Sequence, residues 1–442
     1  MLQWSGIAKN AALAAITECI IMERYQEEAV RAISDLVKTN SALAKGTPRT
    51  PFGEGAAKCL ADFLALAEGM GFETHNYDNY VGEVIFGEGE EFAILCHLDV
   101  VPAGEGWTHD PFGGEISDGK IWGRGTTDDK GPAVCALYAL KALKDEGFVP
   151  GKKIKLIVGC NEECGWRCIE HYNEVAHMPE TGFSPDADFP VIYAEKGILQ
   201  LRFHFVFDRA PFLYMQGGSA PNMVCSYCEV LPRSIQIPKA ESFGLKIKGK
   251  KLICIGKSAH GSTPELGENA MLPLLKYFEH IPDIKNVIDC LFRDKYGLTK
   301  FEDETGRLTM SPNVVKFRKG QLQIVVDIRY PASIPYEEII AAVNKMGLLY
   351  ETINFQPPLY HAKDSALVKT LAEVYEECAG QKAEPVAIGG GTYARALKNG
   401  VGFGPEFPGD PALAHQPDEY ISVERVGLLI DIYKKAVERL TK

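Results

Sequence analysis

Two short apolar runs with a helix pattern between them constrain the fold more than any other feature of this sequence. The runs cover residues 92–96 and 154–158, and each is continuous rather than alternating. Between them, residues 133–146 carry apolar side chains at spacings near three and four, which predicts a helix. Continuous apolar runs that alternate with helices are typical of a largely parallel sheet covered on both faces. The sequence therefore predicts an α/β protein.

The pattern changes near residue 199. Segments 199–205 and 323–329 alternate apolar and polar side chains, which predicts half-exposed antiparallel strands. Helix patterns over 270–279 and 336–346 lie between these strands. Such a mixture is typical of a separate α+β domain.

The chain has 442 residues, which favours two domains over one. A Gly-rich loop at 389–391 and a helix pattern over 424–440 resemble the α/β pattern of the first part of the chain. We therefore expect a discontinuous catalytic domain over 1–198 and 381–442, with a lid domain over 199–380 inserted into it.

Composition limits the partners and the compartment. A net charge of −12 argues against a nucleic-acid partner, and no apolar stretch is long enough to span a membrane. Residues 11–22 are apolar-rich but contain Thr17 and Glu18, which predicts an amphipathic helix rather than an export signal. The cysteines are scattered, and Cys225 and Cys228 lack the further ligands of a zinc site. We expect a cytoplasmic protein without a membrane partner.

The strongest chemical signal follows the first apolar run. His97 and Asp99 are two residues apart, so they point the same way if the strand continues. The carboxyl ends of parallel strands are where open α/β sheets bind ligands. A lone histidine here would more often be structural, so the interpretation depends on what lies around it.

A glycine-rich loop, Gly-Arg-Gly-Thr-Thr-Asp over 123–128, precedes the first predicted helix between the runs. It resembles a phosphate-binding GxGxxG motif, but Asp128 stands at the third glycine position. A carboxylate there would repel a pyrophosphate. The better interpretation is that Asp128 is a metal ligand.

The second apolar run ends near Glu162 and Glu163. Adjacent side chains leave an extended chain in opposite directions, so one carboxylate could bind a metal while the other stays free as a general base. Asp186 and His415 lie in proline-marked loops further along. Imidazole and carboxylate ligands without thiolates suit zinc, manganese or cobalt, and a bridging carboxylate could hold two ions about 3.5–4 Å apart.

At this point the sequence resembles the aminoacylase/carboxypeptidase G2-type family of two-metal hydrolases, and within it the PepV-type dipeptidases. The resemblance covers nearly the whole chain. It is carried by the segments HLDVVPAGEGW, DGKIWGRGTTDDKGP, NEECG, SPDADFPVIYAEKG, GKSAHGSTPELGENA, DIRYP, GGGTYAR and AHQPDEY.

The resemblance implies a role for each candidate residue. One metal ion would be held by His97, Asp128 and Asp186. Asp128 would bridge to a second ion, completed by Glu163 and His415. Glu162 would be the general base that activates the bridging water, and Asp99 would orient His97.

Two residues of the expected lid also match. His260 would stabilise the oxyanion of the tetrahedral intermediate, and Arg329 would bind the terminal carboxylate of the substrate. Asn222 would add a polar contact. Members with a large lid act alone, so the resemblance implies a monomer.

The implied activity is metal-dependent hydrolysis of dipeptides with a free N-terminus, with two divalent ions, zinc first and manganese or cobalt as alternatives. A deacylase that removes an acetyl or succinyl group from an amino acid would use the same centre. A non-catalytic peptide-binding protein would have lost the base or a ligand, and all of these residues are present.

Overall fold

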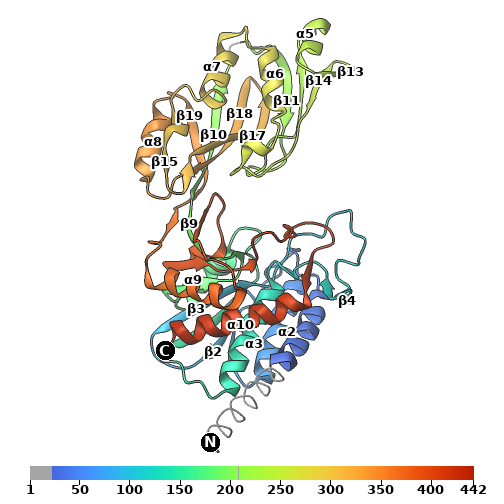
Figure 1. Cartoon of the computed structure of the whole chain (residues 1–442). Coiled ribbons are helices and arrows are strands. Elements are labelled where there is room, and N and C mark those ends of the chain that lie inside the picture. The colour runs from blue at the N-terminus through green and yellow to red at the C-terminus, as the bar shows by residue number, and fades with distance from the viewer. Residues whose placement is uncertain (1–21, 208) are drawn as a thin grey trace, which may run out of the picture. The chain divides into compact units, whose positions relative to one another are not determined.

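The structure is a computed structural model that describes residues 22–207 and 209–442. These residues form two compact units (Figure 1). The first unit contains residues up to Tyr193, His361–Val386 and Thr392–Lys442, and the second contains Ala194–Tyr360 and Ala387–Gly391. Of the amphipathic helix expected over 11–22, only residue 22 lies within the described residues.

The first unit is built on a mixed sheet. Its strands follow the order β1-β2-β6-β3-β7-β22-β9. The central strands β6, β3, β7 and β22 run parallel, whereas β1, β2 and β9 pair with antiparallel neighbours. The bounds are β1 (Glu73–Tyr77), β2 (Val81–Phe86), β3 (Glu91–His97), β6 (Lys153–Gly159), β7 (Thr181–Ser184), β9 (Ile192–Glu195) and β22 (Asn399–Gly402).

Strands β3 and β6 are the two apolar runs, each extended by one residue at both ends. Both are buried at every position after the first. Because successive side chains of a strand point to opposite faces, both faces of the sheet are covered here, as predicted. The parallel arrangement is limited to the central strands, whereas β1 and β2 follow one another in the chain and pair antiparallel, so they need no crossover helix.

Helices pack around this sheet with the periodicity expected from the sequence. In α2 (Glu54–Gly69), the buried residues recur at 56, 59, 60, 63, 64 and 67, which is one helical face. Helix α3 (Lys130–Asp145) contacts β3, β6 and α10 (Val423–Leu440). The start of α10 is fixed by Ser422, whose hydroxyl accepts a hydrogen bond from the Arg425 N–H at 3.1 Å.

Smaller elements complete the first unit. Helix α4 (Arg167–Val175) contacts β2, and α9 (Ala366–Ala379) contacts α10. A three-stranded sheet, ordered β24-β5-β4, joins the chain just before the glycine-rich loop to its C-terminal part. Its bounds are β4 (Glu115–Ser117), β5 (Lys120–Trp122) and β24 (Tyr420–Ser422).

The second unit is an antiparallel sheet with helices. Its strand order is β13-β14-β12-β11-β17-β18-β10-β19, and every pairing is antiparallel. The bounds are β10 (Gly197–Val206), β11 (Phe212–Gly217), β12 (Tyr227–Pro232), β13 (Lys246–Lys248), β14 (Lys251–Ile255), β17 (Thr309–Arg318), β18 (Gln321–Tyr330), β19 (Leu349–Gln356), α5 (Ile237–Ser242), α6 (Met271–Tyr277), α7 (Pro282–Leu291) and α8 (Tyr336–Asn344).

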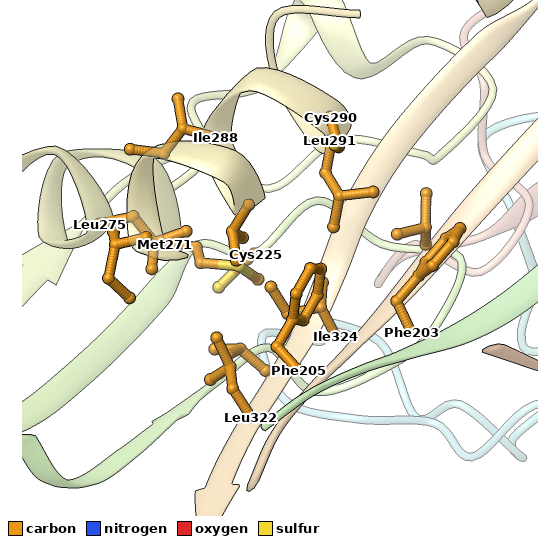
Figure 2. Packing of buried hydrophobic residues seen from close by; sticks show 14 of the residues in the cluster. Phe203, Phe205, Cys225, Met271, Leu275, Ile288, Cys290, Leu291, Leu322 and Ile324 are labelled. Atoms are coloured by element: carbon orange, nitrogen blue, oxygen red, sulfur yellow. The ribbon is translucent and has the colours of Figure 1, made fainter. Parts of the chain in front are cut away.

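The core of the second unit lies between this sheet and its helices. Phe203 and Phe205 on β10 point toward Ile288 and Leu291 of α7 and Leu275 of α6 (Figure 2). The two phenylalanines are two residues apart, so they share the covered face of the sheet. The alternation that predicted these strands therefore reflects one buried face.

The observed division of the chain differs from the expected one at three places, one of which is that Ala387–Gly391 belong to the second unit. The second unit begins at residue 194 and not 199, and residues 361–380 belong to the first unit. The physical reason is helix α9, which packs against α10 rather than against the second unit's sheet. No helix within 22–207 and 209–442 has the length and apolar character needed to cross a bilayer.

Candidate metal centre

The candidate ligands gather at the carboxyl edge of the parallel strands. His97 is the last residue of β3, Glu162 and Glu163 follow β6, and Asp186 follows β7. Because β3 is parallel to both β6 and β7, the three strands end at the same edge of the sheet. Asp128 comes from the glycine-rich loop before α3, and His415 from the loop before β24.

The carboxylate of Asp128 stands in the middle of this group. Its Oδ1 atom lies 3.0 Å from Nε2 of His97, and its Oδ2 atom lies 3.0 Å from Nε2 of His415. On one side, the His97 Nε2 atom is also 3.8 Å from Asp186 Oδ1. On the other, the His415 Nε2 atom is 3.0 Å from Glu163 Oε1. The two oxygens of one carboxylate thus face two separate sets of donor atoms.

The donor atoms fit divalent metal ions. The atoms of His97, Asp128 and Glu163 all lie within 4.8 Å of one another, as do those of His97, Glu162 and Asp186. The Nε2 atom of His97 is buried and makes no hydrogen bond of acceptable geometry in the described part of the chain. A buried nitrogen that faces carboxylates without bonding to them is what a metal ligand needs.

The electrostatics of the cluster lead to the same interpretation. Burial opposes the charge on Asp128, but the imidazoles of His415 and His97 outweigh it and hold the Asp128 pKa below its ordinary value. Hydrogen bonds to Asp128 and Glu163 raise the pKa of His415 to about 11. The histidine protons therefore balance the carboxylates, and a bound divalent cation would take their place.

Glu162 differs from the other carboxylates. Burial, and after it the charge of Asp186, raises the pKa of Glu162 well above its ordinary value. The indole N–H of Trp166 donates to Glu162 Oε1 at 3.0 Å, which fixes the side chain. A half-buried carboxyl group held in this way beside a metal site suits proton transfer.

Asp99 acts differently from what the sequence led us to expect. Its carboxylate accepts hydrogen bonds from the backbone N–H groups of Glu162 at 3.0 Å and Glu163 at 3.2 Å. Its Oδ1 atom is 3.6 Å from Nδ1 of His97, which is too long for a hydrogen bond, and Nδ1 lies 3.0 Å from the Asp99 backbone oxygen. The Asp99 backbone therefore orients His97, and its side chain positions the two glutamates.

Sequence reasoning missed two aromatic residues at the centre. Trp166 holds Glu162, and Tyr393 lies edge-on to both His97 and Trp166, with ring centroids 6.1 and 5.3 Å away. The Tyr393 hydroxyl would sit 2.0 Å from a Cβ atom at Gly159, so only glycine fits at the end of β6. The GGGTYAR segment contained Tyr393, but nothing in its pattern indicated this packing.

The remaining candidates lie in the second unit. His260 has its Nδ1 atom 2.7 Å from the Ser262 hydroxyl, and burial lowers the pKa of His260, with a smaller contribution from Arg329. Arg329 is buried, and its Nε and Nη2 atoms donate to the carboxylate of Asp327. Asn222 is exposed, and its backbone oxygen accepts from the Gly261 N–H. Asp327 was not predicted as a functional residue, although the DIRYP segment contains it.

Hydrolases that activate water with divalent ions use such mixed imidazole and carboxylate clusters, and the fold and the cluster together define the protein as a metal-dependent hydrolase. The model of the family described as "Peptidase family M20/M25/M40" matches residues 93–439. The chain belongs to this family. The family, the α/β fold class and the assignment as a metallopeptidase, all predicted from the sequence, are thereby confirmed.

Individual relatives cover almost the whole chain. YtjP of Bacillus subtilis is 37% identical over 95% of this chain and 98% of its own length. The Beta-Ala-Xaa dipeptidase of Lactobacillus delbrueckii subsp. lactis is 33% identical over 96% of this chain and 98% of its own.

Solved structures share the fold at much lower identity. The aminopeptidase PepT from Bacillus cereus has a TM-score of 0.60 at 17% identity, covering 94% of this chain and 99% of its own. Human carnosine dipeptidase 1 has a TM-score of 0.59 at 12% identity, covering 95% and 98%. At these identities the likeness concerns the fold alone.

Proposed function

We propose that the protein is a metallo-dipeptidase that hydrolyses the peptide bond of dipeptides with a free N-terminus. The observation that carries this proposal is the arrangement of Asp128, whose two oxygens face two separate sets of donors. The membership in a peptidase family and the 33% identity to a Beta-Ala-Xaa dipeptidase support the choice of a short peptide as substrate.

Five residues hold two divalent ions in this proposal. His97 and Asp186 would hold the first ion, Glu163 and His415 would hold the second, and Asp128 would contribute to both. Imidazole and carboxylate ligands without thiolates suit zinc, with manganese and cobalt as alternatives. Ions bound here would lower the pKa of an attacking water and polarise the substrate carbonyl.

Glu162 is the general base. Its carboxylate takes the proton from the attacking water and later delivers it to the leaving amine. Because the Trp166 indole N–H donates a hydrogen bond to Oε1 of Glu162, the carboxylate keeps a fixed orientation during both proton transfers. Asp99 supports this role because it fixes the backbone of Glu162 and Glu163 together.

Residues of the second unit contact the substrate. His260 donates to the oxyanion that forms on the carbonyl oxygen, which fits an imidazole that is neutral at pH 7. Arg329 binds the terminal carboxylate of the dipeptide, and its pairing with Asp327 fixes the guanidinium plane. Asn222 adds a polar contact. In this proposal the second unit serves as the lid domain.

The compartment, the oligomeric state and the partners of the protein are also proposed. It acts in the cytoplasm as a monomer, on small peptides and without nucleic acid or membrane partners. The eleven cysteines among the described residues form no disulfide, which fits a reducing compartment. The net charge of −12 would repel nucleic acid.

Removal of the metal tests the proposal. After chelation and dialysis, we expect the protein to lose hydrolysis of an L-dipeptide and to regain it when two equivalents of Zn²⁺ or Mn²⁺ per chain are added. Circular dichroism of the chelated protein serves as the control for folding. Full turnover by a preparation in which elemental analysis finds no metal would contradict the proposal.

A further inference from the structure

Glu419 is a buried carboxylate that the proposed chemistry does not use. It lies four residues after His415 in the sequence and is completely buried. Its Oε2 atom accepts a hydrogen bond from Nη1 of Arg124 at 2.6 Å. The Arg124 side chain is also buried, so both members of this ion pair are removed from water.

The other oxygen of Glu419 binds the loop that carries Asp128. Its Oε1 atom accepts hydrogen bonds from the backbone N–H groups of Gly125 at 3.0 Å, Thr127 at 2.9 Å and Asp128 at 3.2 Å. One carboxylate oxygen therefore gathers three amides of a single turn, the last of which belongs to the residue with the bridging carboxylate. All four partners of the Glu419 carboxylate are donors, so Glu419 is committed as an acceptor and is not itself a metal ligand.

Backbone contacts strengthen the same connection. The backbone oxygen of Glu419 accepts a hydrogen bond from the Gly123 N–H at 2.8 Å. The Thr127 hydroxyl donates to the backbone oxygen of Tyr420 at 3.0 Å. Strand β24 then pairs with β5, which leads directly into the glycine-rich loop. The segment that bears His415 and the loop that bears Asp128 are thus joined at Glu419 and Tyr420.

We infer that Glu419 is a positioning residue of the metal centre, which fixes the backbone of Asp128 relative to the segment that carries His415. Nε2 of His415 and Oδ2 of Asp128 are 3.0 Å apart, and both belong to the proposed site of the second ion. Outer partners that orient metal ligands set the affinity of the site, and their loss weakens metal binding by about 10–100-fold. This inference rests on the proposed metal centre.

The adjacent residue supplies a matched control. The carboxylate of Asp418 also accepts three hydrogen bonds, from the N–H and hydroxyl of Thr108 and the N–H of His109. These belong to a loop without a proposed ligand. Glu419 and Asp418 therefore anchor two different loops from the same segment, and only one of the loops bears a metal ligand.

Calorimetric titration of Mn²⁺ into the chelated full-length protein tests the inference. The Glu419→Gln variant places an amide N–H₂ among four donors, and we expect it to bind one of the two ions about 10–100-fold more weakly than wild type. The Asp418→Asn variant should bind both ions as wild type does. Glu419→Asp, which keeps the charge but shortens the reach, serves if the glutamine variant does not fold.

The outcomes separate this inference from the proposed function. If the Glu419 variants melt at a lower temperature but bind both ions with wild-type affinity while folded, the role of Glu419 is only structural and the inference is overturned. Equal weakening in Asp418→Asn would also overturn it. If wild type itself binds no Mn²⁺, the proposed metal centre fails and the inference fails with it.

Discussion

The Glu162→Gln variant is expected to lose at least about 10²–10⁴-fold in kcat for dipeptide hydrolysis while it retains both metal ions. The amide has nearly the same size as the carboxyl group and can still accept the hydrogen bond from Trp166. It cannot accept the proton of the attacking water. The effect should therefore fall on the chemical step and leave the KM for the peptide nearly unchanged.

Steady-state kinetics together with elemental analysis would check this expectation. Glu170→Gln provides the control, because Glu170 is an exposed glutamate on α4 and lies outside the cluster. It should leave both activity and metal content unchanged. Near-normal turnover by Glu162→Gln would remove Glu162 from the mechanism, and loss of metal would make it a ligand instead of a base.

The Asp128→Ala variant is expected to lose both ions and all measurable turnover. Each of its two oxygens faces one set of donors, so its removal affects both sites at once. The loss of affinity should exceed the roughly 10–100-fold typical of outer partners. His415→Ala should retain the first ion, because His415 contacts only the Asp128 and Glu163 side of the cluster.

Measurement of the metal content would check these expectations. Wild type should hold two ions per chain, His415→Ala one, and Asp128→Ala none. The folded state of each variant is verified by circular dichroism. A His415→Ala variant that loses both ions would show that the two sites are not separate. An Asp128→Ala variant that retains two ions at wild-type affinity would contradict the bridging role.

The strands and the chemistry at their ends could be predicted from the sequence. The apolar runs at β3 and β6 are continuous because both faces are covered, and that continuity indicated their position in the sheet. His97 ends β3, and Glu162 and Glu163 come shortly after β6, so the topology of a parallel sheet brings them to one edge. Local sequence thus determines which side chains can meet.

Interactions between distant segments could not be predicted. The apolar face of α9 would have suited either unit, and only its packing on α10 decides its place. The resemblance implied that Asp99 orients His97, whereas its carboxylate accepts hydrogen bonds from the backbone of Glu162 and Glu163, which follow the neighbouring strand β6. Glu419 binds amides almost 300 residues earlier, and a hydrogen bond to backbone amides leaves no pattern in the side chains of the loop.

The most direct test of the central claim is the release of free amino acids from a panel of L-dipeptides beside their N-acetylated and N-succinylated forms. The account predicts that the metal-loaded protein cleaves the dipeptides with a free amino group and leaves the acylated forms intact. Cleavage of the acylated forms alone would contradict it, and would make the protein a deacylase that uses the same metal ligands.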